Sequence, residues 1–170
     1  MPRTHGIVKQ IAYVVDDLDA AIDRWVRTLR VGPFFRLDHA VVEDLRYRGE
    51  PSTAELSLAV GNSGGVQIEL LALRNAAPSI YRELPRGVHH LALFADDFER
   101  ESARLAGLGH PVAWALRIPG ICRVHYHDTL DAFGHFVELW EATDTMRGFV
   151  DMVEAAAVDW DGSEPVRRLG

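Results

Sequence analysis

The chain has 170 residues, of which 48% are hydrophobic and 25% charged, as is typical of one globular domain with a substantial core. Its formal net charge of −7 argues against nucleic acid or an anionic membrane as a partner, and no apolar run is long enough to span a bilayer. Cys122 is the only cysteine, which excludes an intrachain disulfide. Because the N-terminal residues also lack an apolar signal core, we expect a cytoplasmic location.

The first part of the chain, residues 7–74, reads as a strand, a helix and three further strands. Asp16 or Asp17 can cap the helix, because a short carboxylate accepts hydrogen bonds from the free N–H groups of a first helical turn. Gly32-Pro33 ends the helical pattern. The expected elements are a strand over 7–15, a helix over 18–29 and strands over 34–42, 54–60 and 66–72, with a loop or ragged hairpin over 43–52.

The same order of elements returns in residues 87–142, after a proline-containing linker over 75–86. A further helix and an irregular tail, which Trp160 would anchor, occupy residues 143–170. The expected elements are strands over 87–95, 111–118, 121–128 and 135–141 and helices over 98–108 and 144–157.

An internal repeat supports this division. The stretch Gln10–Leu18 superposes on His90–Phe98, 80 residues later, and Val66–Leu71 resembles His135–Trp140. Helices that cover one side of mostly antiparallel strands make an α+β domain. We therefore expect one domain of two βαβββ modules, which join into a single curved mixed sheet with helices on its outer face and a concave, ligand-sized cup.

Four polar residues occupy matched positions of the repeat, on the strand faces turned away from the helices. They are Gln10, Glu69, His90 and Glu138. A carboxylate in the middle of an apolar strand is costly unless it is exposed, paired or bound to a metal. Two carboxylates, an imidazole and an amide oxygen suit Zn, Ni, Co, Fe or Mn, without choosing among them. The alternative is a metal-free cup in which the carboxylates pair with Arg or His.

At these residues the sequence resembles the vicinal oxygen chelate superfamily, which includes glyoxalase I, methylmalonyl-CoA epimerase, extradiol dioxygenases and bleomycin or fosfomycin resistance proteins. The resemblance spans residues 7–142 and is nearest to the epimerase-like branch, whose second unit similarly opens with a paired His. It implies one divalent metal ion per chain, held by Gln10, Glu69, His90 and Glu138, and it suggests a homodimer. The stretches that carry it are Gln10–Leu18, Ile68–Leu71, Val88–Ala92 and Val137–Leu139.

The resemblance also implies a chemistry. A divalent ion acts as a Lewis acid on neighbouring substrate oxygens, so that a metal-bound enolate of a small oxygenated carbonyl compound can form. Glu138 is the expected base of such a lyase or isomerase, and Glu55 is the candidate for a second base. Arg123 is a candidate for binding a substrate anion. The residues expected to form an apolar or aromatic wall around the substrate are Phe94, Tyr126, Phe136 and Trp140.

Strand alternation refines these expectations. Arg123 and Tyr126 point to opposite faces of a regular strand, so at most one of them lines the cup. By the same rule His89 lies on the face opposite His90, which predicts a structural role. Cys122 is expected to be inert packing.

Two other functions remain open. A metal-free cup would sequester a hydrophobic or antibiotic ligand, as resistance proteins of the superfamily do. Ring-cleaving dioxygenase chemistry is the least favoured, because its iron site uses two His and one carboxylate, whereas this chain has Gln10.

Overall fold

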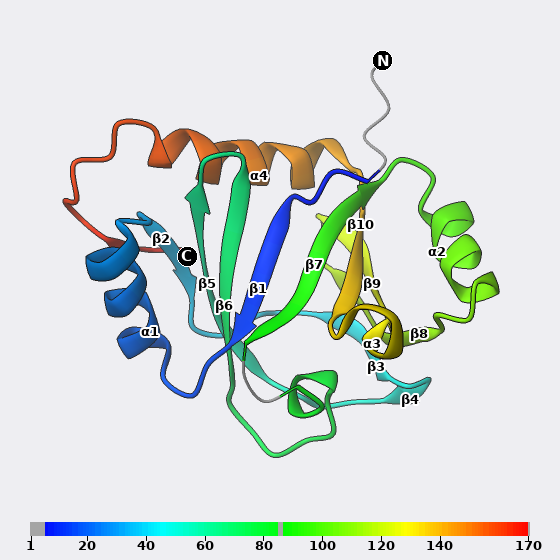
Figure 1. The fold of residues 1–170 in the computed structure, drawn as a ribbon. Coiled ribbons are helices and arrows are strands. Elements are labelled where there is room, and N and C mark those ends of the chain that lie inside the picture. The colour runs from blue at the N-terminus through cyan, green and yellow to red at the C-terminus, as the bar shows by residue number, and fades with distance from the viewer. Residues whose placement is uncertain (1–5, 85–86, 170) are drawn as a thin grey trace.

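The computed structural model describes residues 6–84 and 87–169 of the chain (Figure 1). Residues 1–5, 85–86 and 170, which the predicted domain and its linker include, lie outside the described residues. As predicted, Asp17 caps the first helix, and its carboxylate accepts from the Ala20 N–H at 3.0 Å. The first elements are β1 (Gln10–Val14), α1 (Leu18–Arg24), the π-helical η1 (Trp25–Leu29), β2 (Phe34–Leu37), β3 (Glu43–Tyr47), β4 (Glu50–Pro51), β5 (Leu56–Ser63) and β6 (Val66–Leu73).

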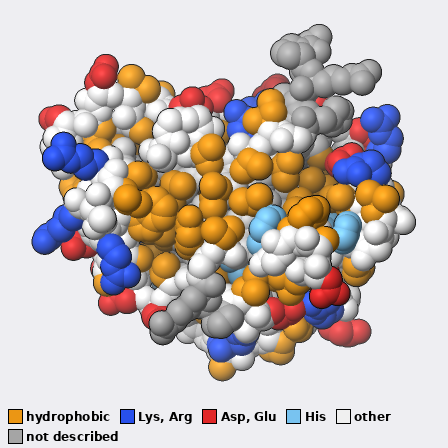
Figure 2. Space-filling model, viewed as in Figure 1, with side chains coloured by type: hydrophobic (Ala, Val, Ile, Leu, Met, Phe, Trp, Pro, Cys, Tyr) orange, Lys and Arg blue, Asp and Glu red, His pale blue; other side chains and the backbone are white. Residues whose placement is uncertain are grey.

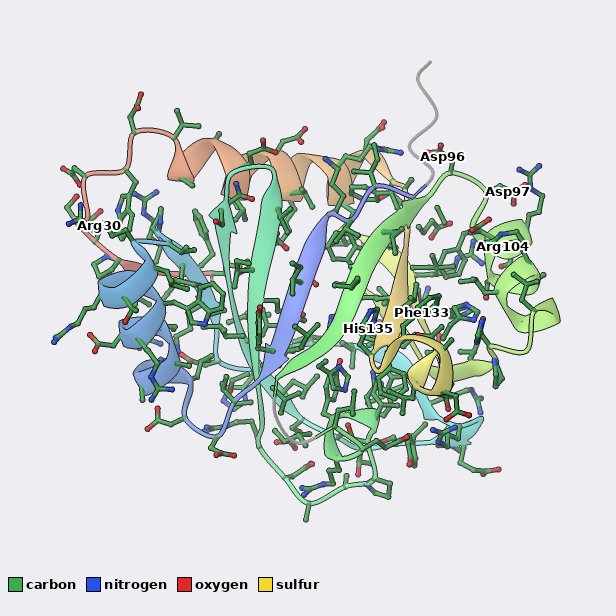
Figure 3. All side chains as sticks on the ribbon, viewed as in Figure 1. Arg30, Asp96, Asp97, Arg104, Phe133 and His135 are labelled. Atoms are coloured by element: carbon green, nitrogen blue, oxygen red, sulfur yellow. The ribbon has the colours of Figure 1, made fainter. Side chains whose placement is uncertain are left out.

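The second part begins after a single 3-10 turn in the linker. Asp97, labelled in Figure 3, caps its first helix by accepting from the Arg100 N–H at 3.2 Å. The elements are η2 (Ile80–Arg82), β7 (Val88–Ala95), α2 (Phe98–Gly107), β8 (Val112–Ile118), β9 (Cys122–His127), α3 (Leu130–Phe133), β10 (Phe136–Glu141), α4 (Asp144–Ala157) and β11 (Val166–Arg168).

The described strands join one mixed sheet in the order β11-β2-β5-β6-β1-β7-β10-β9-β8-β3-β4. Its two halves are built alike. β1 pairs parallel with β6, β7 pairs parallel with β10, and the two halves meet where β1 and β7 run antiparallel. The α+β class and the single mixed sheet are therefore confirmed.

Two helices cover the outer face of the sheet, one over each half, as Figure 1 shows. Leu18 and Ile22 of α1 pack against Leu70, and Phe98 of α2 packs against Leu139. Between the helices the outer face stays uncovered, and Figure 2 shows hydrophobic side chains gathered there. No helix in the described part of the chain is long and apolar enough to cross a membrane.

The hairpin of β3 and β4 does not stay with its own half of the sheet. Tyr47 of β3 pairs with Trp114 of β8, near the far end of the sheet from β2. The strand expected over 34–42 therefore ends at Leu37, because the chain must leave β2 to reach β8. Residues 38–42 make this crossing, and Ala40, Val41 and Val42 face the inner side of the sheet, where they help to enclose a cavity.

The C-terminal helix α4, which lies outside the two modules, packs on the inner face of the sheet, opposite to α1 and α2. Val153 of α4 packs with Phe35 and Val60, and the partly buried Leu58 joins the same cluster. Strand β5 is apolar on both faces, since Ala59 belongs to the cluster under α1 while Leu58 and Val60 face α4. This second apolar face gives α4 a surface to bury, and the helix fills part of the cup.

Residues 159–165 are irregular, as expected, and a short strand, β11, follows them. β11 adds to the edge of the sheet by pairing parallel with β2. Trp160 anchors the turn before it, as predicted. Its indole Nε1 donates to the Ser163 carbonyl at 2.6 Å, and its ring lies so close to Gly32 that a Cβ there would come within 2.6 Å.

Cys122 is expected to resist alkylation in the folded protein. Its side chain is 5% exposed, and burial, with smaller contributions from Glu138 and Glu141, raises the pKa of the thiol to about 12. At about pH 8, only on the order of one molecule in ten thousand then carries the reactive thiolate. Mass spectrometry after iodoacetamide treatment should show unmodified native protein and one adduct in guanidinium chloride. Rapid labelling of the native chain would contradict this.

Candidate functional site

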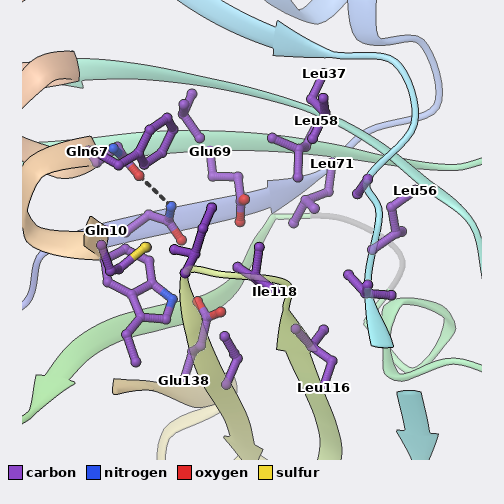
Figure 4. A pocket seen from close by; sticks show the side chains of 18 of the residues that line it. Gln10, Leu37, Leu56, Leu58, Gln67, Glu69, Leu71, Leu116, Ile118 and Glu138 are labelled. Atoms are coloured by element: carbon purple, nitrogen blue, oxygen red, sulfur yellow. Dashed lines mark hydrogen bonds between the residues drawn. The ribbon is translucent and has the colours of Figure 1, made fainter. Parts of the chain in front are cut away.

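Four adjacent strands of the sheet, in the order β6-β1-β7-β10, each present at least one buried polar side chain to the inner face. These strands occupy the centre of the sheet, where the two repeats meet. In Figure 4, Glu69 and Glu138 point toward each other across the cavity, with Gln10 beside them. The matched positions of the repeat thus converge at one place, as the sequence predicts. The four side chains are Gln10, Glu69, His90 and Glu138.

His90 stands between the two carboxylates. Its Nε2 lies 3.1 Å from Glu138 Oε2 and 3.3 Å from Glu69 Oε2. Burial lowers the pKa of His90, but the Glu138 and Glu69 carboxylates more than offset this and raise it to about 9. Burial also raises the pKa of Glu69, and His90 only partly opposes that shift. The site therefore holds two buried acidic groups that require a positive charge beside them.

Several polar atoms of this group have no hydrogen-bond partner. They are buried, and the close contacts of His90 are not aligned as hydrogen bonds. Among the described residues, no three His, Cys, Asp or Glu side chains form a ready-made metal cage. Once His90 gives up its Nε2 proton, these atoms offer converging lone pairs in a buried place, and a cation among them would satisfy all of them together. The atoms are Gln10 Oε1, His90 Nε2 and Glu138 Oε2.

A β-bulge changes the direction of His89. Ala12 of β1 pairs with His90 and Tyr13 pairs with Val88, so that His89 is the extra residue of β7. Its ring lies between Tyr81 and Phe136, at centroid distances of 4.8 and 5.1 Å. The prediction that His89 faces the opposite side from His90 is therefore wrong, because the bulge interrupts the alternation of the strand.

The two histidines form a chain of hydrogen bonds. His89 Nε2 is 3.2 Å from the Ile80 carbonyl oxygen, which can only accept, so this nitrogen carries the hydrogen. His89 Nδ1 is then an acceptor for His90 Nδ1–H, 2.9 Å away. Burial, together with the nearby His90, lowers the pKa of His89 to about 3, which keeps it neutral. The contact orients the His90 ring so that Nε2 faces the carboxylates.

Gln67 belongs to the same group, although the sequence analysis did not select it. It faces Gln10 across the β1–β6 pair, and Gln10 Nε2 donates to Gln67 Oε1 at 2.7 Å (Figure 4, dashed line). The signal was present in the sequence, since alternation places Gln67 on the same face as Glu69.

The group closes one side of an otherwise apolar cavity of about 190 Å³. Side chains of the sheet, residues 40–42 of the crossing segment and helix α4 line it, and it is open to solvent on one side. At the polar side the hydroxyls of Tyr81 and Tyr126 lie 3.1 Å apart, and burial raises the pKa of both well above its usual value. Its apolar lining includes Leu37, Val41, Leu56, Leu58, Val60, Leu71, Leu116, Ile118, Ile121, Val124, Trp140, Met146 and Phe149.

The predicted substrate residues divide into two sets. Tyr126 and Trp140 line the cavity. Phe94 and Phe136 do not: Phe94 packs edge-on against Trp140 at 5.4 Å, and Phe136 is fully buried against His89. Arg123 points away, as alternation requires once Tyr126 faces inward, and its guanidinium pairs with Glu141 at 2.8 Å. Glu55 is exposed and lies outside the cavity lining. The structure thus does not bring Phe94, Arg123 or the second base to the site.

The sequence matches the family described as the glyoxalase/bleomycin resistance protein/dioxygenase superfamily over residues 9–126. No curated protein matches the chain at a significant level.

Solved structures share its fold. A methylmalonyl-CoA epimerase from Mycobacterium tuberculosis is 20% identical, with a TM-score of 0.59 over 87% of this chain and 95% of that one. A hypothetical protein from Bacillus halodurans is 17% identical, with a TM-score of 0.56 over 81% and 95%. A Streptomyces coelicolor methylmalonyl-CoA epimerase in complex with 2-nitronate-propionyl-CoA is 20% identical, with a TM-score of 0.52 over 82% and 96%.

Proposed function

Because the chain belongs to the glyoxalase/bleomycin resistance protein/dioxygenase superfamily, we propose that it is a divalent-metal-dependent lyase or isomerase that acts through an enolate on a small oxygenated carbonyl compound. The observation that carries this proposal is the convergence of two buried carboxylates, an imidazole and an amide oxygen from four adjacent strands. One protonated imidazole is a poor final partner for this set, because buried lone pairs remain unsatisfied around it.

The donor set fits a divalent ion, which Gln10, Glu69, His90 and Glu138 would hold. Such an ion supplies Lewis acidity toward a substrate oxygen and so makes a neighbouring C–H more acidic. Oxygen and imidazole donors of this kind are typical ligands of Zn, Ni, Co, Fe and Mn.

Residues of the chain would supply the base, orient the imidazole ligand and line the cavity. Glu138 is the proposed base, because its carboxylate lines the cavity and can take a proton from a substrate carbon. His89 holds the His90 ring in place through their shared hydrogen bond. Helix α4 and residues 40–42 add apolar side chains to the cavity lining, and an apolar surrounding strengthens the charge interactions beside it.

A metal-free sequestering protein is the second candidate. The apolar lining of the cavity favours it, since such a wall would hold a hydrophobic ligand without any reaction. In that case His90 stays the partner of both carboxylates.

Two further expectations form part of the proposal. A cytoplasmic location follows from the single cysteine and is consistent with a reducing compartment. A homodimer is consistent with the hydrophobic side chains that gather on the uncovered part of the outer face (Figure 2).

Elemental analysis of the tag-free protein tests the metal directly. We expect about one transition-metal ion per chain, and its loss in a double variant with His90→Ala and Glu138→Ala, because two of the four donors are then missing. A wild-type protein that stays metal-free after incubation with each of the five ions would contradict the proposal and favour the sequestering function.

A further inference from the structure

The cavity beside the polar group has a polar floor and an apolar rim. Its polar side chains are all buried, with exposed fractions between 1% and 8%. In Figure 4, Leu37 and Leu116 lie on the far side of the cavity from Gln10. A polar head group of a ligand finds polar partners only at the buried end, so the head enters first and the rest of the ligand follows toward the rim.

The part of the lining that solvent reaches is apolar. Among the described residues, each half-buried or exposed side chain of the lining is a Leu, Val, Ile, Ala or Phe. Val41 of the crossing segment is 71% exposed, and Leu116 and Ile118 of β8 are partly exposed. Apolar side chains that face water around the mouth of a cavity are stabilised when an apolar group covers them.

Two walls connect the floor with this rim. In the sheet, β5 and then β2 follow the carboxylate-bearing β6 on one side, and β9 and then β8 follow the carboxylate-bearing β10 on the other. Leu58 of β5 and Leu37 of β2 line the first wall, and Val124 of β9 and Leu116 of β8 line the second. Since neighbouring strands lie about 4.8 Å apart, each wall reaches roughly 10 Å beyond the strand that carries the carboxylate.

This depth sets a length for the ligand. A zigzag of C–C bonds of about 1.5 Å advances about 1.25 Å per bond, so a hydrocarbon tail of about eight carbons reaches from the floor to the rim. Because the mouth is open, a longer tail continues into solvent without a clash. A ligand with a much shorter tail leaves the apolar rim uncovered.

From these observations we infer that the substrate of this site is a carbonyl compound with a hydrocarbon tail of about eight carbons, whose oxygenated head lies at the polar floor and whose tail follows the two apolar walls to the rim. The inference rests on the proposed function, which supplies the head group, and it deepens that function by naming the class of substrate. The tail takes no part in the reaction, so its contribution can be measured as binding, with or without a metal ion.

A homologous series of 1-hydroxy-2-alkanones with four, six, eight, ten and twelve carbons tests the tail. Each member has the same uncharged head with two neighbouring oxygens, so only the length of the tail varies. Dissociation constants are measured by calorimetry on chelator-treated protein and again after addition of Zn. We expect the affinity to rise roughly two- to fourfold with each added CH2 and to level off beyond the ten-carbon member, whose tail has eight carbons.

The variant Val41→Asp places a charge at the rim, on a side chain that is too exposed to be needed for folding. We expect it to weaken binding of the ten-carbon compound by roughly three- to tenfold and to leave the four-carbon compound within roughly twofold of the wild type, because the short tail does not reach the rim. Ile118→Thr, which keeps a β-branched side chain on β8, should have the same selective effect on the facing wall.

Val158→Asp is the matched control. Val158 is 67% exposed, as Val41 nearly is, but it lies outside the cavity lining. This variant should bind every member of the series as the wild type does.

An affinity that stays within roughly twofold across the series would overturn the inference, and so would equal weakening of the four- and ten-carbon compounds in Val41→Asp. A rise that continues unchanged past the ten-carbon compound would overturn the inferred length. If the affinity rises with tail length in a protein that takes up no metal, the proposed metal-dependent function fails while the inferred class of ligand stands. If the protein takes up metal and tail length has no effect, the proposed function stands and the inference fails.

Discussion

Replacing Glu138 with Gln is expected to lower the affinity of the protein for divalent metal roughly 100-fold or more. The substitution keeps the shape of the side chain and removes its negative charge, so one of two anionic donors is lost from the site. Loss of groups that only support metal ligands already costs roughly 10- to 100-fold in affinity. Calorimetric titration of the chelator-treated variant with Zn, Ni and Co measures the effect.

Glu141→Gln is the matched control for this variant. Glu141 lies on the same strand three residues further on, and its side chain pairs with Arg123 outside the cavity. It should bind metal within roughly twofold of the wild type, because Arg123 pairs at the surface and exposed ion pairs contribute little. Wild-type metal affinity in Glu138→Gln would remove Glu138 from the proposed ligand set.

The same pair of variants addresses proton transfer. When a small oxygenated carbonyl compound of the proposed substrate class is incubated in D2O, its acidic C–H should exchange in the presence of wild-type protein and of Glu141→Gln. We expect Glu138→Gln to slow this exchange by roughly 100- to 10,000-fold, which is the usual contribution of a positioned general base. Exchange at the wild-type rate in Glu138→Gln would show that a group other than Glu138 takes the proton.

Replacing Trp114 with Ala is expected to lower the free energy of unfolding by about 3–5 kcal/mol. Trp114 is 0% exposed and joins three separate parts of the chain. Its ring meets Tyr47 of the crossing hairpin at 6.2 Å and Tyr81 of the linker at 5.7 Å, both edge-on. The alanine variant would leave a cavity between β3, β8 and η2, and urea denaturation of the metal-free protein measures its cost.

Trp114→Phe separates packing from hydrogen bonding at this position. The phenyl ring keeps much of the contact with Tyr47 and Tyr81, and the substitution removes an indole N–H that is buried without an acceptor. We expect the free energy of unfolding to fall by less than about 1.5 kcal/mol, because the smaller ring contact destabilises the fold while removal of the unpaired N–H stabilises it. A loss below about 1 kcal/mol in the alanine variant would show that this junction does not stabilise the fold.

Part of the cup lining comes from segments that the repeat does not share. Helix α4 and residues 40–42 have no counterpart in the second module, yet both line the cavity. The repeated strands therefore account for the position of the polar group, while these segments add much of the apolar lining beside it.

The sequence by itself determined the repeat and the faces of its central strands. Period-two alternation decides which side chains share a face, and the match of Gln10 with His90 and of Glu69 with Glu138 placed all four on the inner one. These are local rules, so the strand positions, both helix caps and the α+β class could be read without a structure. The inner position of Gln67 could have been predicted in the same way.

Only the tertiary structure decided the features that depend on pairing between distant segments. The bulge that turns His89 inward arises from the register of β7 against β1, and the path of residues 38–42 arises from the pairing of β3 with β8. Helix α4 lies on the inner side because β5 has a second apolar face. The Arg123 side chain stays outside the site, where its guanidinium pairs with Glu141. Register and docking are contacts between residues far apart in the chain, and no local period encodes them.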